Sequence, residues 1–128
     1  MRITRSRSLA LFIAMQHIEE ILTEKVIPAG IEISVTDCGE LPIYIHILGK
    51  IKVLSSKKEL GFCSAVHLVK DLNDNWIPTF VDAQINMNGK HGPDVKIKMS
   101  SAKFIDGRKI FDKEPTEEEW KVIENLWI

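Results

Sequence analysis

Cysteine is scarce in this sequence, which has only Cys38 and Cys63 in 128 residues. Two cysteines are too few for the disulfide framework that stabilises many small secreted domains. The C-x-x-C, H-E-x-x-H and H-x-H spacings of common metal sites are also absent from the sequence. We therefore expect reduced thiols, no bound metal and no cofactor, in a chain long enough to bury a core without crosslinks.

The sequence also lacks a charge excess and a long apolar segment. The formal net charge is -1, so no overall field directs the chain to nucleic acid or to an anionic membrane. The apolar run at 9–15 follows three arginines, as in a signal peptide. That run is too short to cross a bilayer, and no small-x-small cleavage site follows it. We expect a cytoplasmic protein without a membrane partner.

No internal repeat, low-complexity tract or linker interrupts the chain, so residues 1–128 are expected to form a single domain. Hydrophobic residues make up 45% of the chain and charged residues 27%. This balance is typical of a folded globular chain and argues against extensive disorder.

A helix is predicted at each end of the chain. Over residues 6–25, apolar residues recur at helical spacing and Pro28 follows, so a helix that packs on its own sheet is favoured over one that binds a partner. Near the C-terminus, Thr116 and Glu119 match a capping box. The helix after this box would present three apolar side chains on one face: Trp120, Ile123 and Trp127.

The segment 43–53 alternates more regularly than any other. Its odd-numbered residues are apolar apart from Gly49, and most of its even-numbered residues are polar. A turn at Gly49-Lys50 would make a hairpin, but it would place Lys52 on the isoleucine face. A single long strand, bent at Gly49, keeps the two faces separate and is the preferred interpretation.

Further strands are predicted at 31–35, 62–69, 79–86 and 95–99, with 62–69 in the centre of the sheet. A hairpin turn is predicted at Asp106-Gly107. Because few helices separate the strands, the sheet must be mostly antiparallel. The predicted fold is α+β: a curled sheet or partly open barrel of five to seven strands, flanked by an N-terminal and a C-terminal helix.

Catalytic and metal-binding arrangements have weak support in the sequence. Cys63 could act with His46 or His67 and be oriented by Asp82, but no nucleophile elbow surrounds it. Cys63 and His67 share the parity of one strand face, and His91 lies in a separate loop. An enzyme or metal protein built on these residues is the third hypothesis for function; enzymatic activity stays uncertain and is not favoured.

Lysines on the polar face of the predicted sheet suggest a second hypothesis. Lysines beside an aromatic residue on a sheet face can bind single-stranded nucleic acid, although an ordinary solvent-facing sheet has the same composition. The candidate binding residues on this face are Tyr44, His46, Lys50, Lys52, Lys96 and Lys98.

The leading hypothesis is a non-enzymatic binding protein that acts through a protein–protein surface, as an inhibitor, adaptor or assembly component. Charge is segregated in the sequence: 84–109 carries six basic and two acidic residues, and 110–128 carries two basic and six acidic residues. Trp127, near the apolar C-terminal end, is expected to dock on its own core or on a partner. A protein partner or self-association is therefore predicted.

Overall fold

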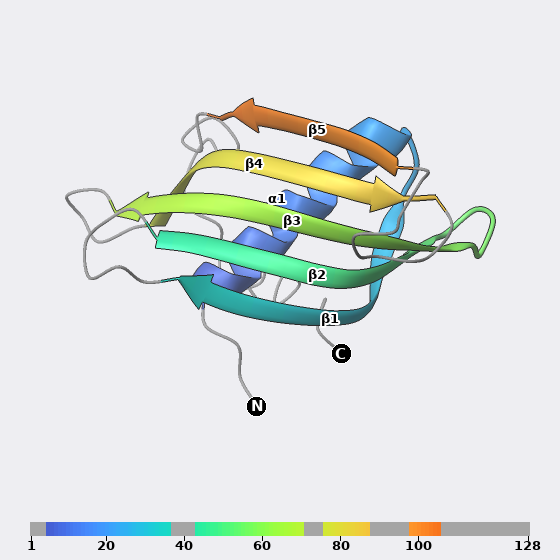
Figure 1. Cartoon of the computed structure of the whole chain (residues 1–128), viewed down its shortest axis with the longest axis horizontal. Coiled ribbons are helices and arrows are strands. Elements are labelled where there is room, and N and C mark those ends of the chain that lie inside the picture. The colour runs from blue at the N-terminus through green and yellow to red at the C-terminus, as the bar shows by residue number, and fades with distance from the viewer. Residues whose placement is uncertain (1–4, 37–42, 71–75, 88–97, 106–128) are drawn as a thin grey trace.

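The computed structural model describes residues 5–36, 43–70, 76–87 and 98–105. Within these ranges the chain forms one helix and five strands, and the strands pair antiparallel in the order β1-β2-β3-β4-β5. The helix lies behind the sheet in Figure 1, so that view looks onto the opposite face of the sheet. The elements are α1 (Arg5–Leu22), β1 (Val26–Thr36), β2 (Ile43–Val53), β3 (Glu59–Lys70), β4 (Trp76–Asn86) and β5 (Lys98–Phe104).

Helix α1 confirms the predicted N-terminal helix and its packing on the protein's own sheet. It ends at Leu22, where Thr23 adopts a positive φ of 55° that cannot continue a right-handed helix. Its apolar side chains, among them Leu11, Met15 and Ile18, are buried in the same core as the strands. No helix in the described ranges has the length and the apolar character needed to cross a membrane.

Strand β2 runs without interruption from Ile43 to Val53, so the long-strand prediction is confirmed. Ile45, Ile47 and Ile51 are fully buried on the side of α1, and the even-numbered residues point the other way. Gly49 has a φ of +151°, and a Cβ atom there would overlap the carbonyl oxygen of Gly30 on β1. This close approach between β1 and β2 explains why a glycine interrupts the isoleucine pattern.

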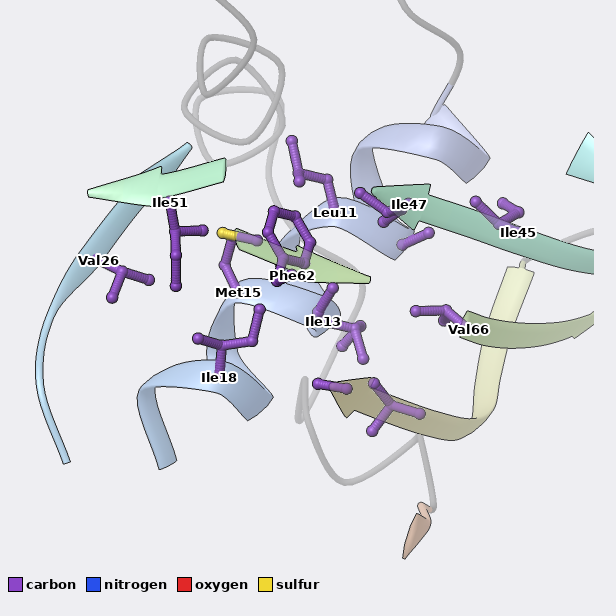
Figure 2. Close-up of a cluster of buried hydrophobic side chains, with 14 of the residues drawn as sticks. Leu11, Ile13, Met15, Ile18, Val26, Ile45, Ile47, Ile51, Phe62 and Val66 are labelled. Carbon is purple, nitrogen blue, oxygen red and sulfur yellow. The ribbon is translucent and has the colours of Figure 1, made fainter. Parts of the chain in front are cut away.

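The hydrophobic core lies between α1 and the near face of the sheet. Figure 2 shows Leu11 and Met15 of the helix beside Phe62 of β3, and Ile18 and Ile47 belong to the same buried cluster. Central strand β3, as predicted, pairs with β2 on one side and with β4 on the other. One helix and one sheet face thus bury the main apolar half of each alternating strand, and the other face of the sheet carries polar and aromatic side chains.

The predicted barrel-like fold between two helices is wrong. Within the described residues the sheet has five strands and is open, because β1 and β5 are its two edges and do not pair with each other. Closure is not needed to bury the core residues of the strands, since α1 covers the face on which they lie. The predicted C-terminal helix is not among the described elements; it falls, with the hairpin turn at 106–107, outside the described residues.

Candidate binding face

We call the sheet surface on the side opposite α1 the open face. Within the described residues no helix or strand covers it (Figure 1). It exists because each strand alternates, so that every second side chain points away from the helix. The strand register places these residues on the open face: Glu32 and Ser34; Tyr44, His46, Leu48, Lys50 and Lys52; Glu59, Cys63, Ala65 and His67; Phe80, Asp82 and Gln84; Ser100, Ala102 and Phe104.

Four aromatic side chains form a continuous row across the open face. The ring centroids of Tyr44 and His67 are 4.5 Å apart, and those of His67 and Phe80 are also 4.5 Å apart. Phe80 then meets Phe104 edge to face at 5.4 Å. We call Tyr44, His67, Phe80 and Phe104 the aromatic row. Aromatic pairs in these arrangements contribute about 0.5–1.5 kcal/mol each beyond the area that they bury.

The aromatic row follows directly from the strand register. Tyr44 of β2 lies opposite His67 of β3, which lies opposite Phe80 of β4, which lies opposite Phe104 of β5. Directly opposed side chains on one face of antiparallel strands are the closest neighbours in a sheet. The first three rings are half-buried, whereas Phe104 is 87% exposed at the edge strand. The row thus ends in a large apolar side chain that is almost fully in solvent.

The His67 imidazole acts as part of this aromatic surface. Partial burial lowers the pKa of His67 below its usual 6.5, and the nearby His46 lowers it further, while the Asp82 carboxylate opposes both effects. The Asp82 carboxylate is engaged elsewhere as well, because it accepts a 2.7 Å hydrogen bond from the Ala65 backbone N–H. His67 is therefore neutral at neutral pH, and the row carries no charge there.

The described side chains of the open face carry no surplus of positive charge. By strand register they include two lysines and three carboxylates, which gives a net charge of -1 when both histidines are neutral: Lys50, Lys52, Glu32, Glu59 and Asp82. Lys52 lies directly opposite Glu59. The lysines lie toward the end of the sheet away from the aromatic row, which begins at Tyr44, near the start of β2. The face therefore has an apolar aromatic end and a mixed-charge end.

The predicted binding residues of β2 do lie on one face. Tyr44, His46, Lys50 and Lys52 all point away from α1, and Lys98 of β5 occupies a register position on the same face. The remaining two candidates, at positions 96 and 127 (Lys96 and Trp127), lie outside the described residues.

The residues of the suggested catalytic or metal site have other contacts. Cys63 is exposed, and its sulfur lies 3.9 Å from Oε1 of Gln84. The His67 ring instead lies between Tyr44, which it meets edge to face, and the tilted ring of Phe80. Within the described part of the chain, no group of three or more His, Cys, Asp or Glu side chains converges on a point that could hold a metal ion. His91 lies outside that part.

Sequence reasoning misses three members of the aromatic row as parts of a binding surface. The sequence suggests His67 only for catalysis or metal binding, and it suggests Phe80 and Phe104 only as parts of strands or turns. Each lies on a different strand, so their proximity depends on the register between strands rather than on spacing within one. The register also shifts between His67 and Leu68, and no local sequence pattern predicts this shift.

The chain was compared with protein-family models, with curated proteins and with solved structures, and none of them matches it.

Proposed function

We propose that this chain is a binding protein that docks a protein partner on its open face, with the aromatic row at the centre of the contact. The observation that carries the proposal is the row itself, with Phe104 87% exposed at its end. Exposed aromatic side chains are enriched among the few residues that supply most of the binding energy in protein interfaces.

The composition around the row supports a protein partner. An interface of this kind has an apolar centre and a polar rim that fixes orientation. Here Leu48, 38% exposed, extends the apolar surface along β2. Beyond Leu48 lie lysine and glutamate side chains, which carry opposite charges, and Lys52 lies opposite Glu59. A partner that matches this pattern presents apolar side chains to the row and charged groups of both signs to the far end.

Charge is the reason to favour protein over nucleic acid. Aromatic rings on an open sheet can also stack bases, but binding to a phosphate backbone draws its affinity from a surplus of lysine and arginine. Among its described side chains the open face has no such surplus, since two lysines stand against three carboxylates. The neutral state of His67 adds no positive charge at neutral pH.

The test compares two single substitutions of exposed apolar residues in full-length protein. Phe104→Ser removes the exposed end of the aromatic row, and Leu54→Ser removes a side chain that is 41% exposed in the turn between β2 and β3. Each variant is used as bait in host extract, and co-purifying proteins are quantified against the unchanged chain. A hot-spot residue contributes about 2 kcal/mol or more. Phe104→Ser should therefore weaken the affinity for the specific partner roughly thirtyfold.

The matched control decides the outcome. The partner should be retained by Leu54→Ser and lost with Phe104→Ser, after circular dichroism shows both variants folded. Equal retention or equal loss in the two variants would contradict docking on the aromatic row. The nucleic-acid alternative is tested with a fluorescent single-stranded oligonucleotide at low salt. Tight binding that weakens steeply as salt rises would overturn the proposal of a protein partner.

A further inference from the structure

The two edges of the sheet differ in how well they are protected against pairing with another strand. On β1, the register shifts between Pro28 and Ile31, and Gly30 has a positive φ of 111°. A proline, a bulge and a bend are the usual means by which a sheet edge avoids further pairing. Strand β5 pairs with β4 in an unshifted register from Lys98 to Phe104 and has no proline or glycine.

The backbone groups available on the β5 edge can be identified from the hydrogen bonds on its inner side. Ile105 N–H donates to the Thr79 carbonyl at 3.0 Å, so odd-numbered residues of β5 point their backbone groups toward β4. Bonding direction alternates along an antiparallel strand. The N–H and C=O groups of Ser100 and Ala102 therefore point outward, away from β4, where no described strand lies.

Lys103, near the end of β5, does not protect this edge. Lys103 is on the same side of the sheet as α1, and its ammonium lies 2.5 Å from Oε2 of Glu20. His17 of the same helix is 3.5 Å from the carbonyl oxygen of Ser101 through Nε2. These contacts join β5 to the helix and direct the Lys103 ammonium toward α1 and away from the outer edge.

We propose that this edge pairs with β5 of a second copy of the chain, antiparallel about a two-fold axis at Ser101, to form a continuous sheet across a homodimer. In this register Ser100 lies opposite Ala102 of the second copy, and Phe104 lies opposite Lys98 of the second copy. The outward-pointing residues then become the hydrogen-bonded pairs, each of which exchanges two bonds.

Residue size and charge favour this register over those centred on either lysine of β5. The centre of the strand is Ser100-Ser101-Ala102, whose small side chains allow two strands to approach closely. Each of the two lysines faces an apolar residue of the second copy, because Lys103 meets Met99 and Lys98 meets Phe104. Registers centred on Lys98 or Lys103 would place identical charges directly opposite each other, which is destabilising.

The chosen register also covers the most exposed apolar side chain of the described residues. Phe104 is 87% exposed in the single chain, and Met99 is 39% exposed on the other side of the same strand. Both are at register positions that face the second copy. A lysine beside an aromatic ring adds a favourable cation–π contact in such a pair.

The first test is the mass of the full chain in solution across a range of concentrations, by analytical ultracentrifugation. Ser100→Pro removes an outward N–H from each copy without removing a bond to β4, and Ser100→Thr keeps that N–H as the matched control. We expect the unchanged chain and Ser100→Thr to form dimers. Ser100→Pro should dissociate at least about tenfold more readily, because two intermolecular hydrogen bonds are lost. A chain that stays monomeric at high concentration overturns the proposal.

The second test uses charge and does not depend on how the proline is tolerated. Phe104→Lys would oppose Lys98 of the second copy, whereas Phe104→Glu would pair with it. We expect dimers of Phe104→Lys to be roughly three- to thirtyfold weaker than those of Phe104→Glu, because two symmetric pairs change at once. Raising the salt concentration should narrow this difference. Equal dimerisation of the two variants, or a stronger Phe104→Lys dimer, overturns the proposed register.

Discussion

Gly49 offers a direct test of how β1 and β2 approach each other. Two independent costs follow from Gly49→Ala. Its φ of +151° is rarely adopted by residues with a side chain, and the new Cβ would overlap the Gly30 carbonyl oxygen and lie 3.0 Å from the Cα of Ile31. The neighbours in conflict are backbone atoms of a paired strand, so no side-chain rotation can relieve the overlap. Backbone strain costs about 1–3 kcal/mol, and the displacement of β1 adds to it.

The matched control is Gly30→Ala, on the partner strand. Gly30 also has a positive φ, +111°, but a Cβ atom there would have nothing within 4 Å. Gly30→Ala therefore tests the strain alone, and we expect a loss of about 1–3 kcal/mol in the free energy of unfolding. Gly49→Ala should lose at least about 1 kcal/mol more, in the range of severe core substitutions.

Equilibrium urea unfolding followed by far-ultraviolet circular dichroism measures both variants. With a slope of about 2 kcal/mol per molar urea, the expected losses lower the midpoint by roughly 0.5–1.5 M for Gly30→Ala and by at least about 0.5 M more for Gly49→Ala. If Gly49→Ala were as stable as Gly30→Ala, the close backbone contact would not exist in solution. The approach of β1 to β2 would then not be the reason for the glycine within the isoleucine pattern.

Three further predictions concern the core, the helix contact and the aromatic row. Ile47→Ala should cost about 2–5 kcal/mol in the free energy of unfolding because Ile47 is fully buried, whereas the adjacent Leu48→Ala, on the open face, should cost under about 1 kcal/mol; equal losses would contradict the assigned faces. The pKa of Glu20 is lowered mainly by the hydrogen bond from Lys103, so the stabilising effect of its carboxylate is present above the usual pKa of 4.5 and is lost as the pH falls below it. Glu20→Gln should therefore be less stable than the unchanged chain by at most about 1 kcal/mol at pH 7, and urea unfolding should give the two chains the same free energy of unfolding at acidic pH. The pKa of His67 is lowered by burial, so below pH 6.5 the unfolded chain binds more protons than the folded chain and the fold loses stability. His67→Phe should reduce this loss, and an unchanged dependence of the free energy of unfolding on pH would contradict the prediction.

The strands were predictable where a local alternation determined the result. Odd and even residues of 43–53 differ in polarity, and a one-residue slip would turn every isoleucine toward solvent. The long β2 strand therefore followed from the sequence, and Lys52 excluded the competing hairpin. Helix α1 followed from apolar spacing in the same way, and its end was missed by a few residues because Thr23 carries no strong stop signal.

The openness of the sheet could not be obtained from local patterns. Whether β1 meets β5 depends on twist and on what covers the apolar face, and both are properties of the whole assembly. The aromatic row was missed for a related reason. Its four rings are contributed by four strands, and a bulge near His67 sets the alignment of Phe80 with its neighbours. Tyr44 was identified because it lies on the same strand as the lysines.

The two proposed contacts meet at Phe104, and this makes their relationship testable. Phe104 ends the aromatic row on the open face and also lies on the β5 edge, where it would oppose Lys98 of the second copy. If pairing at the edge fixes the Phe104 ring in the orientation that the partner contacts, dimerisation strengthens partner binding; if it covers the ring, dimerisation weakens it. Linkage requires the effect to be reciprocal, so the partner must shift the dimer equilibrium by the same factor. Ser100→Pro, which leaves Phe104 in place, separates the two: a change in partner affinity in that variant reports the coupling and not the loss of an aromatic contact.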